Sequence, residues 1–279
     1  MDSLNDSDTT DTVADLAARR PADLLENDVL PTPIVSCLIQ ELQTLADLQN
    51  YHRWVFDEIC PFLGTKIAEI GGGIGTFSRQ IVLEYLSSNR NARLEIFEPT
   101  ACLFDQLERN FRQLHGECLA SGALTITPGH FRTAPKQYDS ILLINVLEHV
   151  QREDTLFHQI HESLQSNGVL IVFVPALQWL YSELDKKVGH YRRYEQESLY
   201  SLFERNGFTV VKTKYMDILG ILPWYLMNVL GKSHSFNPFL TKLYDQWFVP
   251  ATRLVEQLSG AAVGKNLLMV GRTRSSSPL

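Results

Sequence analysis

The chain has 279 residues, of which 44% are hydrophobic, and its formal net charge is −7. This length suits one large domain or two small ones, and the composition is that of a globular protein that buries a sizeable core. Residues 1–30 account for −6 of the charge, so the remainder carries only −1 and has no field that would attract nucleic acid. We therefore expect no nucleic-acid partner.

Two segments precede the first predicted strand. Residues 1–30 hold eight acidic side chains and are poor in apolar residues until Val13, which predicts that most of this acidic tail is disordered. Residues 31–64 are predicted to form a helical cap. The N-terminus lacks the apolar core of a secretory signal, and the longest apolar run, Ile218–Leu230, is too short to cross a bilayer. These features predict a cytoplasmic protein.

Four cysteines are spread along the chain without a Cys-x-x-Cys pair: Cys37, Cys60, Cys102 and Cys118. This spacing predicts buried free thiols in a reducing compartment. We expect no metal site.

From residue 65 onward, short β-rich runs alternate with helical patterns. Seven strands are predicted, at 65–71, 93–99, 124–129, 138–146, 168–176, 209–216 and 266–273. Helices are predicted at 75–87, 101–115, 155–166 (with Asp154 as N-cap) and 195–208. The alternation predicts an α/β fold with a doubly wound, mostly parallel, Rossmann-like sheet over 65–216 and 263–275. Residues 217–262 interrupt it and are predicted to be a helical, aromatic-rich insertion before the last strand.

The first predicted strand leads into a glycine-rich stretch, AEIGGGIG (residues 68–75), in which Gly71, Gly73 and Gly75 alternate with other residues. Glycines let the backbone approach a ligand, and the following helix start offers free N–H groups. The spacing departs from the dinucleotide fingerprint, whose third glycine would fall at Thr76. Glu69 puts a carboxylate where a pyrophosphate would be repelled and an ammonium group attracted. Glu98, ending the second strand, is placed to accept hydrogen bonds from ribose hydroxyls, a device that dinucleotide folds also use.

Together, EIGGGIG (69–75), FEP (97–99) and YDSILLINVLEHV (138–150) strongly resemble the class I S-adenosylmethionine-dependent methyltransferases. The resemblance covers about residues 43–216 and the final strand. It implies a seven-stranded sheet whose last two strands form an antiparallel hairpin, with S-adenosyl-L-methionine as cofactor.

The resemblance also implies cofactor-binding positions. The glycine loop would hold the methionine end and approach the ribose, Glu98 would take the ribose hydroxyls, and Pro99 would lie beside the adenine. Many relatives carry an acidic residue after the third strand, where this chain has His130 and Phe131, so we expect backbone and stacking contacts to the adenine. The predicted cofactor residues are Glu69, Gly71, Gly73, Gly75, Glu98, Pro99, His130, Phe131 and Asn145.

The segment LDKKVGHYRRYEQESL, residues 184–199, is similar to a segment of a bacterial subgroup of these enzymes. It follows the carboxyl end of a strand, where open sheets bind ligands. We predict His190 as a general base, Tyr191 and Tyr194 as positioning groups, and Arg192 or Arg193 as a clamp for an anionic substrate group. The alternative is structural: the arginines pair with Asp185, Glu195 or Glu197, and His190 caps the next helix.

His149, in LEHV, is a weaker candidate for a base, because Glu148 and His149 can equally brace the loop beneath the cofactor. Tyr51 and Trp54 are predicted to cover the cofactor or, with equal weight, to pack in the core.

The insertion, which contains Trp224, is interpreted first as a lid and pocket wall for an apolar acceptor. Two alternatives stay open: contact of 217–249 with a lipid surface, and a homodimer interface.

The predicted activity is methyl transfer from S-adenosylmethionine to a small-molecule or lipid-linked acceptor, at oxygen rather than nitrogen. Positioning of the two reactants is expected to dominate, because a positioned base contributes less than near-attack geometry does. The alternatives are an NAD(P)-dependent oxidoreductase and a non-catalytic binding protein that retains the fold.

Overall fold

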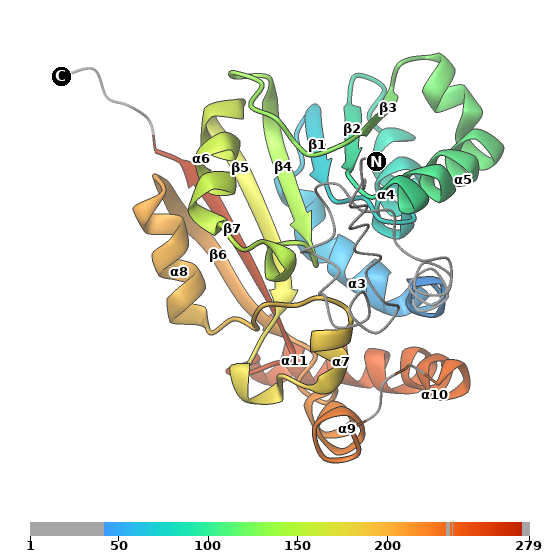
Figure 1. The fold of residues 1–279 in the computed structure, drawn as a ribbon, viewed down its shortest axis with the longest axis vertical. Helices are drawn as coiled ribbons and strands as arrows, with labels where there is room; N and C mark the ends of the chain where they lie inside the picture. The colour runs from blue at the N-terminus through green and yellow to red at the C-terminus, as the bar shows by residue number, and fades with distance from the viewer. Residues whose placement is uncertain (1–41, 233–234, 236, 275–279) are drawn as a thin grey trace, which may run out of the picture.

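A computed structural model describes residues 42–232, 235 and 237–274; the predicted acidic tail and Cys37 lie outside the described residues. Figure 1 shows one central sheet with helices on both sides. Its strands are β1 (Lys66–Ile70), β2 (Arg93–Glu98), β3 (Leu124–Pro128), β4 (Tyr138–Ile144), β5 (Leu164–Pro175), β6 (Phe208–Met216) and β7 (Asn266–Thr273).

The strand order is β3-β2-β1-β4-β5-β7-β6, and every pair from β3 to β5 is parallel. Strand β7 runs antiparallel to both of its neighbours, β5 and β6. The predicted α/β fold, seven strands and antiparallel final pair are confirmed. Because the order reverses beside β1, the ends of β1 and β4 leave open the crevice in which such sheets bind ligands.

Strand β5 shows why the sequence of a central strand is apolar at consecutive positions. Val169, Ile171 and Phe173 belong to the core on one face, whereas the alternate residues, such as Leu170 and Val172, belong to the core on the other. Both faces are therefore covered, as expected for a parallel sheet.

Helices α3 (Gln49–Ile59), α4 (Thr76–Gln80) and α5 (Ala101–Ala120) pack on one face of the sheet. Helices α6 (Glu153–Ser163) and α8 (Gln196–Arg205) pack on the other. Shorter helical segments are η2 (Cys60–Phe62), η3 (Ile81–Leu86), η4 (Leu147–His149), η5 (Gln178–Leu180) and α7 (Glu183–Lys187).

Three local predictions need correction. Helix α6 begins at Glu153 after an N-cap at Arg152, so Asp154 lies in the first turn, where it pairs with Arg205, and is not the cap. Helix α5 runs past the predicted end and kinks at His115. The described cysteines are free but only partly buried: Cys60, Cys102 and Cys118.

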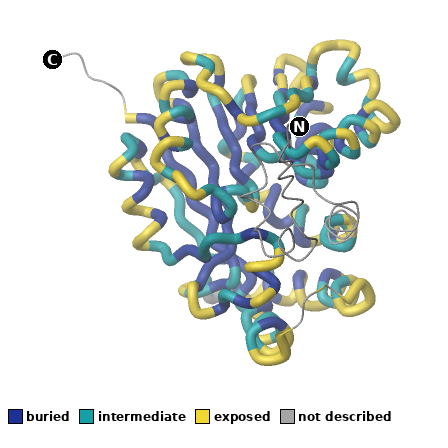
Figure 2. Tube along the Cα trace, viewed as in Figure 1, coloured by how far each residue is buried: buried dark blue, intermediate teal, exposed yellow. Residues whose placement is uncertain are grey.

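The insertion before β7 is helical, as predicted. It contains α9 (Ile221–Trp224), η6 (Tyr225–Leu230), α10 (Pro238–Leu243), η7 (Tyr244–Phe248) and α11 (Val249–Ser259). Figure 2 shows the central strands as buried and much of this insertion as exposed. Among the described residues, no helix is both long and apolar enough to cross a membrane.

Candidate functional site

In the loop between β1 and α4, Gly71, Gly73 and Gly75 differ in what surrounds them. Gly71, Gly73 and Gly75 all have positive φ angles, of 77°, 57° and 88°. A Cβ on Gly71 would lie 2.6 Å from Val146 Cγ2, and one on Gly75 would lie 2.4 Å from Phe111 Cε2. A Cβ on Gly73 would meet nothing within 4 Å. Gly71 and Gly75 are therefore required by packing, whereas Gly73 faces open space that a ligand can occupy.

Glu98 is fixed beside this open space by two backbone amides. Its Oε2 accepts from Gly73 N–H at 2.8 Å, and its Oε1 accepts from Thr100 N–H at 2.8 Å. Burial raises the pKa of Glu98, and the two amides oppose this rise. Each oxygen keeps a second lone pair, so the carboxylate is oriented to accept two further hydrogen bonds.

Glu69 is the other acidic group of the loop. Its side chain is buried, and Oε2 has no hydrogen-bond partner. Burial raises the pKa of Glu69 to about 7, and the nearby Glu98 adds to the rise. An ammonium group brought beside this carboxylate would offset the cost of burying its charge.

The remaining predicted cofactor residues border the same edge of the sheet. Pro99 follows β2 and is partly buried, and His130 follows β3 and is exposed. Asn145, directly after β4, is exposed and strained, with φ of 52°, and its N–H donates to Phe173 O. Such strain in a non-glycine residue is typical of functional sites.

Phe131 lies in the core instead. Its ring is 5.2 Å from that of Phe97, edge-on, and 6.2 Å from that of Tyr138, and the residue is 5% exposed. Little of the ring is therefore open for stacking on an adenine.

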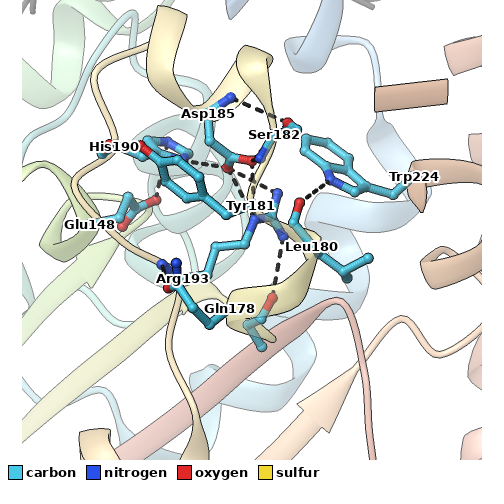
Figure 3. A network of polar contacts seen from close by, with 10 residues as sticks. Glu148, Gln178, Leu180, Tyr181, Ser182, Asp185, His190, Arg193 and Trp224 are labelled. Carbon is cyan, nitrogen blue, oxygen red and sulfur yellow. Dashed lines mark hydrogen bonds and ion pairs between the residues drawn. The ribbon is translucent and has the colours of Figure 1, made fainter. Parts of the chain in front are cut away.

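The segment after β5 is built around Asp185 on α7 (Figure 3). Arg193 Nε donates to both Asp185 oxygens, at 3.1 and 3.2 Å, and Arg193 NH2 lies 3.0 Å from Oδ1. Ser182 N–H and Oγ donate to Oδ2 at 2.8 and 2.9 Å. The structural alternative for Arg193 therefore holds: its side chain is 2% exposed and committed to Asp185, so it is not available to clamp a substrate.

His190 is held by the same carboxylate. Its Nδ1 lies 2.8 Å from Asp185 Oδ1, and its Nε2 lies 3.9 Å from Glu148 Oε1 (Figure 3). Burial raises the pKa of Glu148 to about 7 and lowers that of His149 to about 3. The rings of His149 and His190 are 4.6 Å apart. The structure thus brings together the two histidines predicted as bases, but around a buried carboxylate.

Of the other predicted site residues in this segment, Tyr194 is buried, whereas Arg192 and Tyr191 are half-buried. The Tyr194 hydroxyl is buried and donates to Glu153 Oε1 at 2.5 Å, within reach of Leu147 O, which gives it a structural role. Arg192 is half-buried, with NH1 2.6 Å from Glu153 Oε2. Tyr191 is half-buried as well, and its N–H donates to Glu148 O at 2.8 Å.

Tyr51 and Trp54 lie on helix α3, and Trp224 lies on helix α9 of the insertion. Trp54 is 1% exposed, so it packs in the core, as the alternative held, and cannot cover a ligand. The Tyr51 hydroxyl accepts from Asn266 Nδ2 at 2.6 Å. Trp224 is half-buried, donates from Nε1 to Leu180 O, and stacks on the Arg193 guanidinium at 4.5 Å.

The sequence analysis did not identify the Lys265–Asp217 ion pair or the central role of Asp185. Lys265 Nζ pairs with Asp217 Oδ2 at 2.8 Å and lies 5.9 and 5.6 Å from the ring centroids of Tyr51 and Trp224. Asp217 has a φ of 71°, and no motif marked either residue. Asp185 was considered only as an ion-pair partner, although Ser182 three residues before it carries the pattern of a capping box.

The profile of a methyltransferase-domain family matches residues 37–213. The fold is similar to that of a putative sarcosine dimethylglycine methyltransferase from Galdieria sulphuraria, at 14% identity and a TM-score of 0.53, over 80% of this chain and 84% of that one. It is also similar to phosphoethanolamine N-methyltransferase 2 from Haemonchus contortus, in complex with S-adenosyl-L-methionine, at 12% identity and a TM-score of 0.52, over 82% of this chain and 57% of that one.

A third similar structure is the [4+2]-cyclase SpnF, at 12% identity and a TM-score of 0.52, over 80% of this chain and 79% of that one. A search of curated protein sequences gives no match. Family and fold confirm the predicted architecture and agree with S-adenosylmethionine as the cofactor. The similarity of residues 184–199 to a bacterial subgroup stays a prediction.

Proposed function

Because the chain belongs to the methyltransferase-domain family, we propose that it transfers a methyl group from S-adenosylmethionine to a small-molecule or lipid-like acceptor. The observation that carries the proposal is the geometry of Glu98. Two backbone amides aim this carboxylate beside Gly73, the loop glycine whose Cβ position is open.

The residues present fit this cofactor. Glu98 would accept from the two ribose hydroxyls, and the unpaired oxygen of Glu69 would face the methionine ammonium group. Asn145, at the end of β4, would border the methionine end. When bound, the cofactor supplies an electrophilic methyl group on a sulfonium.

The protein's own contribution is expected to be positioning and exclusion of water. Aligned reactants contribute up to ~7–11 kcal/mol, whereas a positioned base contributes about 10²–10⁴-fold in rate. Both ring nitrogens of His190 face carboxylates, Asp185 on one side and Glu148 on the other, so it has no nitrogen directed to an acceptor. We therefore assign acceptor contacts to the half-buried Arg192 and Tyr191 and keep Arg193 and Tyr194 as their scaffold.

The acceptor class is inferred from the solvent-exposed apolar side chains of the insertion, which together we call the apolar face. Its members are large apolar side chains that point to solvent: Leu222, Leu226, Leu230, Phe239, Trp247, Leu254 and Leu258. Phe239 is 73% exposed and Trp247 is 70% exposed. Side chains this exposed do not line an enclosed pocket, so the earlier lid interpretation does not account for them.

The charges around the apolar face favour an anionic lipid surface. All three acidic residues of the insertion are buried: Asp217, Asp245 and Glu256. Lys232 and Lys242 are exposed beside the apolar side chains. A face that combines aromatic anchors with outward cations suits an anionic bilayer, from which a lipid-like acceptor could be reached. A homodimer through the same face is the competing outcome.

The proposal is tested by incubating the full chain with radiolabelled S-adenosylmethionine and either anionic vesicles that carry bacterial lipid extract or the water-soluble extract. We expect label in the lipid fraction, and mass spectrometry of the product tests oxygen as the attacking atom. Glu98→Ala is the negative control. Label in the soluble product alone would refute the lipid-like acceptor.

The alternative is a protein that binds the cofactor but transfers no methyl group. It stays open because a similar fold belongs to a protein named as a [4+2]-cyclase and not as a methyltransferase. Cofactor binding without transfer of label to either extract would favour it. An NAD(P)-dependent oxidoreductase is disfavoured by the buried Glu69 carboxylate, which a pyrophosphate would have to approach.

A further inference from the structure

Three side chains with metal-binding atoms meet between η4 and the end of α7. They are Glu148, His149 and His190, and their potential ligand atoms all lie within 4.8 Å of one another. Glu148 and His149 are adjacent in η4, directly after β4, whereas His190 comes from the segment after β5. The hydrogen bond from Tyr191 N–H to Glu148 O, at 2.8 Å, joins the two segments.

Glu148 lacks the partners that a buried carboxylate requires. The residue is 0% exposed, and neither Oε1 nor Oε2 has a hydrogen bond among the described residues. The nearest cationic group, His190 Nε2, is 3.9 Å from Oε1, too far for a hydrogen bond. The guanidinium of Arg193 is committed to Asp185. A buried carboxylate without hydrogen bonds points to a proton or a cation that is held at this position.

The His190 imidazole is held by a carboxylate on the side away from Glu148, as metal-ligating histidines commonly are. His190 Nδ1 is 2.8 Å from Asp185 Oδ1, which turns Nε2 toward Glu148 (Figure 3). Asp185 is itself fixed by Ser182 and Arg193. The His149 ring lies 4.6 Å from the His190 ring, at the same cluster. The carboxylate behind His190 leaves its other nitrogen for a cation.

We propose that Glu148, His149 and His190 bind a divalent transition-metal cation of the zinc class, with one coordination position left for water or acceptor. Two imidazoles and a carboxylate are a ligand set that zinc takes, and three protein ligands leave its fourth position open. Tetrahedral bonds of about 2.0–2.2 Å require ligand atoms about 3.3–3.6 Å apart, so the cluster contracts on binding. The partial exposure of His149 and His190 supplies the route of entry.

The sequence did not indicate this site, because the Glu-His pair and His190 are some 40 residues apart and no ligand spacing relates them. The site does not depend on the proposed methyl transfer. A cation on His190 Nε2 and a general-base role for the same nitrogen exclude each other.

The test uses the full chain, first freed of metal with a chelator. We titrate it with Zn²⁺ by calorimetry and with Co²⁺ by visible absorption, for the wild type and for Glu148→Gln, His190→Gln and Asp185→Asn. His158→Gln is the matched control, since His158 is an exposed imidazole on α6. Circular dichroism verifies that each variant is folded.

We expect one equivalent of Zn²⁺ and a Co²⁺ spectrum of low coordination number in the wild type and in His158→Gln. Loss of a ligand in Glu148→Gln or His190→Gln should weaken binding by at least tenfold, and loss of the supporting carboxylate in Asp185→Asn by about 10–100-fold. Zinc should also raise the Tm of the wild type and leave that of Glu148→Gln unchanged. Absence of stoichiometric binding in the wild type, or binding that Glu148→Gln and His190→Gln do not weaken, would overturn the proposal.

Discussion

Buried carboxylates set the chemistry at the scale of single residues. Glu69, Glu98 and Asp185 are all enclosed, yet each has a different set of partners. Asp185 is saturated by an amide, a hydroxyl and a guanidinium, Glu98 has one backbone amide on each oxygen, and Glu69 keeps one oxygen unpaired. Of these three, Glu69 is therefore the carboxylate whose charge state responds most to a bound cation.

Glu69 predicts a pH dependence of cofactor affinity. Its pKa of about 7 means that a proton competes with the methionine ammonium group below neutrality. We expect S-adenosylmethionine to bind about eightfold more weakly at about pH 6 than at about pH 7.5, and Glu69→Gln to remove this difference. Calorimetry in buffers of matched ionic strength measures both, and an equal pH dependence in Glu69→Gln would contradict the assignment.

The same shift has a consequence for stability without cofactor. The folded protein holds the Glu69 proton up to about pH 7, whereas the unfolded chain releases it near 4.5. The contribution of Glu69 to the free energy of unfolding therefore falls as pH rises between these values.

At the scale of elements, helix α3 depends on a residue of the distant insertion. Its N-cap, Leu48, offers no side-chain acceptor. Asp245 of η7 supplies one instead: its carboxylate accepts from Asn50 N–H at 3.1 Å and from Tyr51 N–H at 2.9 Å. The insertion thus holds in place the helix that covers one face of the sheet.

Asp245→Ala should lower the free energy of unfolding by about 2 kcal/mol, because the start of α3 loses its cap and buried amides lose a charged partner. Urea denaturation followed by circular dichroism measures the change. Gln246→Ala, the exposed neighbour, is the control and should change stability by less than about 0.5 kcal/mol. Equal effects of the two variants would contradict the capping role.

The apolar face makes a prediction for the insertion as an element. The wild type should float with anionic vesicles and less with neutral ones, and Phe239→Asp or Trp247→Asp should weaken this partitioning by about 10–100-fold. Leu114→Asp on α5, 57% exposed but outside the face, is the matched control and should have no effect. Self-association of the wild type by light scattering, without vesicle binding, would favour the homodimer instead.

At the scale of the whole molecule, the sequence predicted those features that depend on local patterns. Runs such as 168–176 predict strands because both of their faces are covered, and the glycine loop follows from backbone geometry alone. The burial of Arg193 and Phe131 depends on contacts with other segments that no periodicity records. The cap of α3 joins residues 195 positions apart, and the Glu148–His190 cluster joins two strand ends.

The position of Glu98 is predicted by its place at the end of β2, but its two amide partners are set by the turn of the glycine loop. For the apolar face, the sequence indicated the residue types but not the direction in which their side chains point. Its composition was visible in the sequence, and only the exposure of its side chains distinguishes an outward surface from a pocket wall.

The most direct test is calorimetric titration of the full chain with S-adenosylmethionine, S-adenosylhomocysteine and NADH, for the wild type and Glu98→Ala. We predict that the two sulfur compounds bind and NADH does not. Glu98→Ala should weaken their binding by roughly 10²–10⁴-fold, since two hydrogen bonds to a charged group are worth about 1.5–3 kcal/mol each. Binding of NADH alone, or unchanged affinity in Glu98→Ala, would contradict the account of this site.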